Sequence, residues 1–160
     1  MIGPKHLVVL HQIISRLNAA DVNWAVTGSL GLALQGVPVE AHDIDLETDQ
    51  TGVYAIERLF SEFVTQGVRF CTAERIRSHF GALMIDGIKL DIMGGVQYWR
   101  ADGTWEDPAN WQSHKGLIEI NRMLVPVLSL EYECEAYQKL GRTDKVELLG
   151  QWLHPQNGSA

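Results

Sequence analysis

The chain has 160 residues, of which 46% are hydrophobic and 21% are charged. This length predicts a single domain, because domains usually span on the order of 100 to 200 residues, and the composition is typical of globular proteins. The 20 acidic residues exceed the 13 Lys and Arg residues and give a net charge of -7. That balance argues against general nucleic-acid binding, which requires clustered cations.

Two further features limit the class of protein. The cysteines Cys71 and Cys134 show no C-x-x-C spacing, so the sequence gives no support for a zinc site. The apolar run from Leu7 to Leu10 is shorter than a signal-peptide core or a membrane span. We therefore expect a cytoplasmic protein that does not bind membranes.

The first half of the chain alternates predicted helices and strands. Apolar residues at helical spacing predict an amphipathic helix over residues 7–17, and a short strand follows at 24–27. A helix over 30–35, with the preceding serine as its cap, comes next. Residues 42–48 alternate acidic and apolar side chains and predict a half-buried strand. A second amphipathic helix is predicted over 53–63.

The second half is predicted to hold two hairpins and two helices. Asp86–Gly87 suits a type I′ turn between strands 80–85 and 88–93, and the polar stretch 94–113 predicts a long surface loop. The remaining predicted elements are strands at 117–120 and 123–128, a helix over 130–140 capped by Ser129, and a last short helix that follows Thr143 as its cap and runs to Trp152.

These elements predict an α/β (α+β) fold, with a mixed sheet of about five strands flanked by helices. We expect one domain over residues 1–160. Its core spans about 5–95, and a C-terminal hairpin and helices span about 116–153. A flexible tail is expected at 154–160, because its composition is polar and rich in small residues.

Gly28–Ser29 lies between a predicted strand and a predicted helix. At such a junction, a glycine and a serine commonly form only a turn and a helix cap. The same pair can also serve a ligand, because glycine allows close approach of the backbone while the serine and the first helix amides meet phosphate oxygens. The residues alone leave both interpretations open.

Asp43 and Asp45 lie two residues apart on the strand predicted at 42–48. Side chains at this spacing project from the same face, with Cα atoms roughly 6.6 Å apart, so the two carboxylates can converge on one or two cations. A solvated strand face is the alternative. Aspartate is a poor strand former, however, and a bound metal would offset the stability that two aspartates lose in one strand.

Asp91 repeats this feature within the otherwise apolar strand at 88–93. If that strand pairs beside the strand at 42–48, the three carboxylates Asp43, Asp45 and Asp91 gather on one face of the sheet. Oxygen ligands of this kind suit Mg²⁺, which completes its shell with water and substrate phosphates. Two such ions about 4 Å apart activate an attacking oxygen and stabilise the leaving one.

In this order, Gly28–Ser29, Asp43-Ile44-Asp45 and Asp91 resemble the pattern of the polymerase-β-like nucleotidyltransferase superfamily. The likeness is greatest to its small bacterial members that modify lincosamides and aminoglycosides, and it spans roughly residues 13–93. The resemblance implies a nucleotidyltransferase-like fold. It also implies that Asp43 and Asp45 bind Mg²⁺ and the nucleoside triphosphate, that Asp91 assists one metal and the attacking hydroxyl, and that Ser29 holds the β and γ phosphates.

The resemblance extends to the C-terminal part of the chain. The segment from Val125 to Ser129, leading into Lys139, is similar to one in which relatives supply a phosphate-contacting lysine. Here the spacer is shorter and Asp144–Lys145 stands in reversed order. Lys139 is accordingly either a phosphate ligand or a solvated helix lysine. Glu131 and Glu133 are candidates for the general base.

Two rival functions fail on the residues. A calcium loop starting at Asp43 lacks glycine at its sixth position and glutamate at its twelfth. A glycosyltransferase with an Asp-x-Asp metal site explains neither Gly28–Ser29 nor Asp91.

The function expected is Mg²⁺-dependent transfer of a nucleoside monophosphate from a triphosphate to a hydroxyl of an antibiotic-like small molecule, with release of pyrophosphate. The alternative is an antitoxin-type nucleotidyltransferase that modifies or binds a protein partner, or a nucleotide-binding homologue with weak catalysis. Few residues follow Asp91 for an acceptor site, so a second subunit, as in a homodimer, is expected to complete it.

Overall fold

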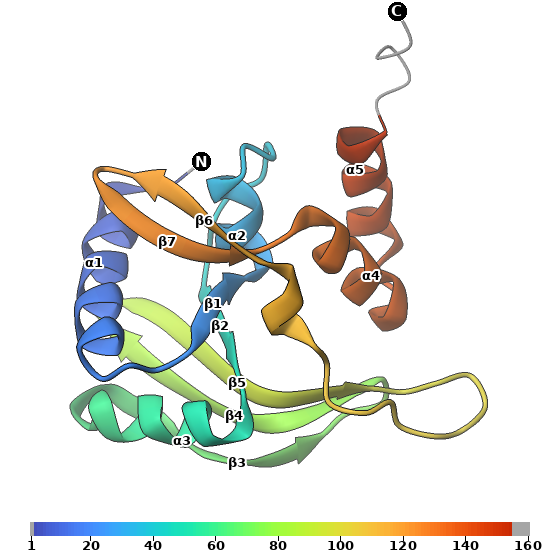
Figure 1. Ribbon diagram of the computed structural model, residues 1–160, viewed down its shortest axis with the longest axis horizontal. Coiled ribbons are helices and arrows are strands. Elements are labelled where there is room, and N and C mark those ends of the chain that lie inside the picture. The colour runs from blue at the N-terminus through green and yellow to red at the C-terminus, as the bar shows by residue number, and fades with distance from the viewer. Residues whose placement is uncertain (1, 155–160) are drawn as a thin grey trace, which may run out of the picture.

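The computed structural model describes residues 2–154 and contains one mixed β-sheet with helices on both of its faces (Figure 1). Of the tail predicted at 154–160, all but the first residue lies outside the described residues. Among the helices of the described part, none has the length and apolar character needed to cross a membrane.

The sheet has seven strands in the order β3-β4-β5-β2-β1-β7-β6, so the prediction of about five was too low. The strands are β1 (Trp24–Thr27), β2 (Ile44–Thr48), β3 (Val64–Thr72), β4 (Ile76–Ile85), β5 (Ile88–Tyr98), β6 (Lys115–Ile120) and β7 (Met123–Leu128). β3 was missed because its side chains are mostly exposed and show no apolar alternation. β5 also continues into the stretch that was predicted to be a loop.

β2 lies in the middle of the sheet and organises it. It pairs antiparallel with β1 and parallel with β5, while β1 pairs parallel with β7. The predicted hairpin of β4 and β5 is confirmed, and both turn residues have the positive φ that a type I′ turn requires, 50° at Asp86 and 79° at Gly87. β5 is thereby brought to the side of β2.

Within residues 2–154, five helices accompany the sheet: α1 (Pro4–Ala19), α2 (Gly28–Leu34), α3 (Gln50–Leu59), α4 (Leu130–Leu140) and α5 (Thr143–Leu153). Short 3₁₀ turns lie at Ser61–Phe63 and Trp111–His114. In Figure 1, α1 lies on the left of the sheet and the α4–α5 pair on the right. The predicted helix at 53–63 is therefore an α-helix followed by a separate 3₁₀ turn.

The caps of these helices match the sequence in part. Ser129 Oγ accepts a hydrogen bond of 3.2 Å from the Tyr132 amide, which confirms it as the cap of α4, and Gly141 ends this helix in the left-handed conformation. The predictions for Ser29 and Thr143 were wrong, because α2 and α5 begin after Thr27 and Arg142. The chain turns into each helix one or two residues earlier than the caps suggested.

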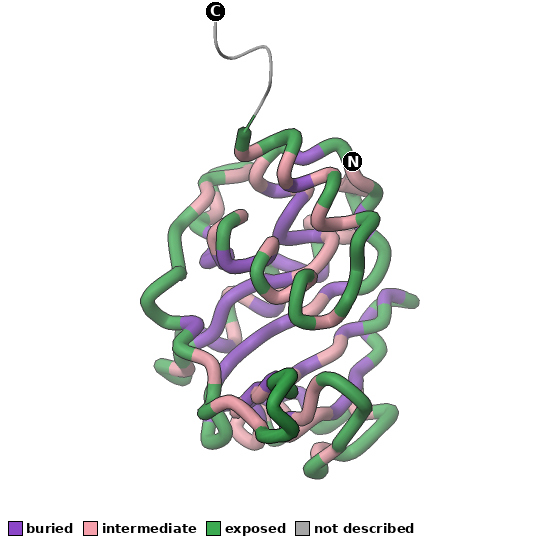
Figure 2. Tube along the Cα trace, turned by 90° about the vertical axis from the view of Figure 1, so that its right-hand side faces the viewer, coloured by how far each residue is buried: buried purple, intermediate pink, exposed green. Residues whose placement is uncertain are grey.

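The main hydrophobic core lies between the sheet and α1 and α3. Figure 2 shows the buried residues, in purple, gathered in the interior of the chain. On β2, Ile44 and Leu46 point into this core together with Leu10 and Ile13 of α1 and Ile56 of α3. Because side chains alternate along a strand, Asp43, Asp45 and Glu47 face the other side.

Candidate active site

The three predicted carboxylates come together where β2 and β5 run side by side. In the parallel register of these strands, Asp45 is the partner of Asp91. Asp43 stands one residue before β2, is exposed and lies on the same face. The strand that carries Asp91 therefore does pair beside the strand that carries Asp45, which was the condition for bringing the carboxylates together.

A pocket of about 350 Å³ opens over this face. Gly28, Ser29, Asp43 and Asp45 line it, so the structure joins the first two sequence features in one cavity. Asp91 lies beside Asp45 in the sheet but is not among the lining residues of the pocket. Apolar side chains from β4, β5 and α4 complete the wall: Ile76, Met93, Ala136 and Leu140.

Gly28 is required at its position for two reasons. Its φ is +69°, a conformation that residues with a side chain rarely adopt, and a Cβ at this point would overlap the carboxylate of Asp45. The turn between β1 and α2 therefore packs directly on the carboxylate. Ser29 Oγ accepts a hydrogen bond of 3.3 Å from the His42 amide, which ties the same turn to the residue before Asp43.

The carboxylates oppose one another electrostatically. Burial, followed by the charges of Asp91 and Asp43, raises the pKa of Asp45 to about 7. Burial also raises the pKa of Asp91, against the effect of Lys89, whose Nζ lies 3.5 Å from Asp91 Oδ1. That oxygen is buried and, within the described residues, accepts no hydrogen bond. The carboxylates of the site therefore carry more negative charge than the neighbouring cations and hydrogen-bond donors balance.

This donor set fits Mg²⁺ better than a metal that needs a closed cage. No group of three or more His, Cys, Asp or Glu side chains within residues 2–154 is already arranged around a single ion position. Mg²⁺ does not need one, because it binds through one or two carboxylates together with substrate phosphates and water. Asp43, Asp45 and the Asp91 oxygen that accepts no hydrogen bond offer that partial shell.

Two glutamates add to the acidity of the pocket. Glu47 follows Asp45 on the same face of β2, is 2% exposed and accepts a hydrogen bond of 3.1 Å from the Tyr132 hydroxyl. Burial raises its pKa to about 7. The sequence pattern contained Glu47 as part of the acidic alternation, but it gave no reason to place this residue inside rather than at the surface.

The side chains of Glu133 and Glu131 point in different directions relative to the pocket, a difference that the sequence left open. Glu133 is 3% exposed and lines the pocket, whereas Glu131 lies on the exposed side of α4. Burial raises the pKa of Glu133 to about 8, although hydrogen bonds from Thr27 and Gly28 lower it. Of the two candidates for a base, only Glu133 faces the site.

The cations of the pocket come from the start of α5. Arg142 and Lys145 line the cavity, and Arg142 also forms an ion pair of 3.2 Å with Asp144. Lys139 instead binds Glu106 across a neighbouring pocket, at 3.0 Å. Sequence reasoning therefore singled out a lysine that the structure places next to the carboxylate pocket, and missed two cations inside it.

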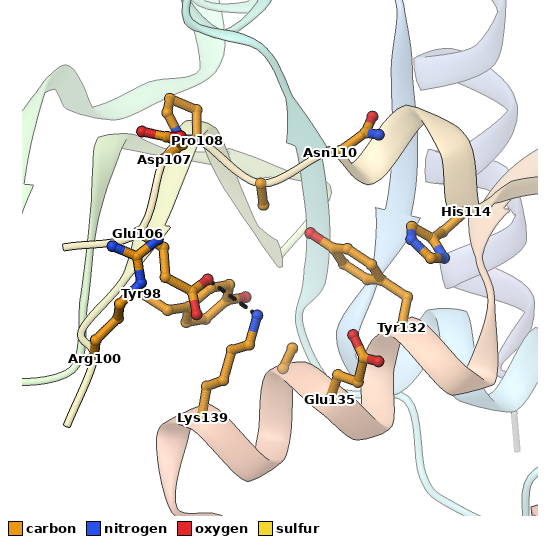
Figure 3. Close-up of a pocket in the computed structure, with 12 residues that line it drawn as sticks. Tyr98, Arg100, Glu106, Asp107, Pro108, Asn110, His114, Tyr132, Glu135 and Lys139 are labelled. Atoms are coloured by element: carbon orange, nitrogen blue, oxygen red, sulfur yellow. Dashed lines mark hydrogen bonds and ion pairs between the residues drawn. The ribbon is translucent and has the colours of Figure 1, made fainter. Parts of the chain in front are cut away.

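The neighbouring pocket, of about 280 Å³, lies between α4 and the segment after β5. Figure 3 shows Tyr132, Glu135 and Lys139 of α4 opposite Tyr98 and Glu106, with the ion pair of Lys139 spanning the gap. Tyr98 and Tyr132 line both pockets. A second polar cavity thus adjoins the carboxylate pocket.

A mixed sheet with aspartates in register on two adjacent strands, and a Gly-Ser turn packed on one of them, is the arrangement that the sequence resemblance implies for a nucleotidyltransferase. The sequence profile of the aminoglycoside-2''-adenylyltransferase family matches residues 9–149. The chain belongs to this family and is an enzyme of nucleotidyltransferase type.

Solved structures agree with this assignment. A crystal structure from Thermotoga maritima, of a protein provisionally described as a nucleotidyltransferase, is 56% identical, covers 98% of this chain and 97% of its own, and gives a TM-score of 0.85. The lincosamide antibiotic adenylyltransferase LnuA, solved with lincomycin, is 15% identical, with 92% and 96% of the two chains covered and a TM-score of 0.59.

ANT(2'')-Ia, solved with adenylyl-2''-tobramycin, is also 15% identical, with 96% of this chain and 92% of that chain covered and a TM-score of 0.61. At this identity, the last two structures establish the fold alone. No curated protein sequence matches the chain significantly.

Proposed function

We propose that this enzyme transfers a nucleoside monophosphate from a nucleoside triphosphate to a hydroxyl of an antibiotic-like small molecule, with Mg²⁺ as cofactor. The observation that carries the proposal is the register of Asp45 with Asp91, with Asp43 on the same face. In the reaction, the acceptor oxygen forms a bond to the α phosphorus, the bond from this phosphorus to the bridging oxygen breaks, and pyrophosphate leaves.

The metal ligands in this proposal are Asp43, Asp45 and Asp91. Bound Mg²⁺, as one or two ions, neutralises the charge that develops on the phosphate oxygens. The raised pKa of Asp45 reflects burial and repulsion in the absence of such a cation. Asp91, whose Oδ1 accepts no hydrogen bond, is the group we assign to assist the attacking hydroxyl by accepting its proton.

The triphosphate is expected to lie along the Gly28–Ser29 turn. Ser29 supplies a hydroxyl to the β and γ phosphates, and Gly28 lets them approach the backbone. Arg142 and Lys145 line the same cavity and supply positive charge to the phosphates. Lys139 can contribute only after leaving Glu106, so we expect it to have the smallest role of the three cations.

The acceptor is proposed from the enzymes whose structures this chain resembles. LnuA and ANT(2'')-Ia are antibiotic adenylyltransferases, solved with lincomycin and with an adenylylated tobramycin, respectively. The polar pocket beside the carboxylate site provides space for a hydroxyl-bearing molecule of this class. A protein acceptor, as in antitoxin-type relatives, is the competing outcome.

Calorimetry tests the nucleotide half of the proposal. ATP, CTP and GTP are titrated into the wild type with Mg²⁺, and into a variant that combines Asp43→Ala with Asp45→Ala. We expect binding of at least one triphosphate by the wild type and none by the variant. The matched control is Asp86→Asn, which removes a carboxylate at the β4–β5 turn, outside the pocket. Equal binding by the wild type and the double variant would overturn the metal site.

Mass spectrometry tests the acceptor. The wild type is incubated with Mg²⁺, the triphosphate that binds best, and either lincosamides, aminoglycosides or a panel of proteins. A mass increase of one nucleoside monophosphate on an antibiotic supports the proposal. A mass increase on protein alone would replace it with the antitoxin-type function.

A further inference from the structure

Glu133 is one of two deeply buried carboxyl groups that line the pocket and that the proposed reaction does not use; the other is Glu47. It projects from α4 into the turn between β1 and α2, and its side chain is 3% exposed. The Thr27 hydroxyl donates hydrogen bonds to its carboxyl group, and the Gly28 amide donates one of 3.2 Å to Oε1. One side chain thus accepts hydrogen bonds from two successive residues of the turn.

The same turn is in contact with the metal-ligand candidates. Gly28 packs on the Asp45 carboxylate so closely that a Cβ would overlap it. Any shift of the turn therefore changes the space available to Asp45. Glu133 binds the other side of the turn. It thereby ties the turn to α4, which is more than 100 residues away in the sequence.

We infer that Glu133 is a positioning residue of the nucleotide site, which holds the Thr27–Gly28 turn in place for the phosphates and against Asp45. This inference rests on the proposed function, because it assigns the turn to a nucleotide. In this role Glu133 is not the general base, because its carboxyl oxygens already accept hydrogen bonds from Thr27 and Gly28. Glu133 affects the nucleotide through these two residues.

The neighbouring residue on α4 supports the same arrangement. The Tyr132 hydroxyl binds Glu47 of β2 at 3.1 Å, so consecutive residues of α4 attach the helix to β2 and to the turn after β1. Glu131, one residue further back, is exposed and provides a control on the same helix. Buried polar contacts therefore couple the position of α4 to the shape of the Thr27–Gly28 turn.

Hydrogen exchange of backbone amides tests the inference without nucleotide. Glu133→Leu removes the acceptor of the Gly28 amide, whereas Glu133→Gln keeps one acceptor oxygen. We expect Gly28 to exchange at least about tenfold faster in Glu133→Leu, because a buried hydrogen bond is lost. Little change is expected in Glu133→Gln or in the control Glu131→Leu. If Glu133→Leu fails to fold, Thr27→Val, which removes only the hydroxyl, is measured instead.

Affinity for the Mg²⁺ complex of the triphosphate is the second measurement. Glu133→Leu and Thr27→Val should weaken it about tenfold, and Glu133→Gln should restore it to within about threefold of the wild type. Unchanged Gly28 exchange, or unchanged affinity in folded Glu133→Leu, would overturn the inference. A wild type that binds no nucleotide would overturn the proposed function by itself, and the exchange data would still decide whether Glu133 holds the turn.

Discussion

The two faces of the sheet differ sharply along a single strand. On β2, Ile44 and Leu46 enter the core beneath α1 and α3, while Asp45 and Glu47 face the pocket beneath α4. The first face is filled by side chains that gain stability from burial. The second face buries carboxyl groups whose raised pKa values show that burial opposes their charge. One face therefore stabilises the fold, and the other gives up stability for a binding site.

The largest expected effect comes from removing a carboxylate from the pocket face. Asp45→Asn should lower nucleotidyl transfer on the order of 10³-fold, because metal-ion stabilisation of the transition state amounts to several kcal/mol. The variant should be at least as stable as the wild type above pH 7, since it removes a charge that burial disfavours. Product formation and urea unfolding measure the two effects. A variant that is inactive and also strongly destabilised would contradict the division between the faces.

A change on the core face should have the reverse effect. Leu46→Ala removes a fully buried side chain one residue away and should lower the free energy of unfolding by about 2–5 kcal/mol. Transfer activity per folded molecule should stay within about threefold of the wild type at a temperature where the variant is folded. Thermal unfolding and activity normalised to the folded fraction test this. A large loss of normalised activity would show that the two faces are not independent.

Gly28→Ala should sharpen the comparison at the turn that touches Asp45. The substitution forces a side chain into a φ of +69° and against the carboxylate. We expect a loss of stability of about 1–3 kcal/mol and about tenfold weaker triphosphate binding. Gly150→Ala on α5 is the matched control, because a Cβ there meets no atom within 4 Å. Calorimetry on both variants decides whether the effect is specific to the turn.

The acidity of the pocket face predicts how stability depends on pH. The pKa of Glu133 rises to about 8 in the folded chain, from an ordinary value of 4.5, chiefly through burial. Between these values the folded chain keeps a proton that the unfolded chain releases. The free energy of unfolding should therefore decrease from about pH 5 to about pH 8, by at most about 1.4 kcal/mol per pH unit for this group.

Asp45 and Glu47 titrate in the same direction and add to that decrease. Glu133→Gln removes one titrating group, so its decrease should be shallower than that of the wild type. Urea unfolding at pH 5, 6, 7 and 8 provides the comparison. Parallel curves for the two proteins would show that Glu133 does not retain a proton on folding.

The smallest effect is expected from Lys139→Ala. The side chains of Lys139 and Glu106 remain 38% and 27% exposed, and ion pairs of this kind contribute within about 1 kcal/mol. Lys145→Ala removes a cation that lines the carboxylate pocket and should weaken triphosphate binding more. Calorimetry with both variants ranks the two lysines. A larger loss in Lys139→Ala would restore the role that the family resemblance implied for it.

Local patterns were sufficient for much of the fold. Helical spacing placed α1, the Ser129 cap placed α4, strict alternation placed β2, and Asp86–Gly87 placed the turn between β4 and β5. β3 escaped prediction because it is an edge strand with mostly exposed side chains, so burial imposes no alternation on it. The extension of β5 escaped because it contains Gly94 and Gly95, which favour a loop when considered alone.

The sequence by itself determined which residues can carry the chemistry: a Gly-Ser turn, two aspartates on one strand face, and a third in an apolar strand. Their types and spacing follow from local geometry, which neighbouring residues fix. Only the tertiary structure decided which of them meet. Pairing of β2 with β5 sets Asp45 beside Asp91, and the docking of α4 turns Glu133 inward while leaving Glu131 outside. These contacts depend on packing between segments far apart in the chain, and short-range patterns contain no measure of that packing.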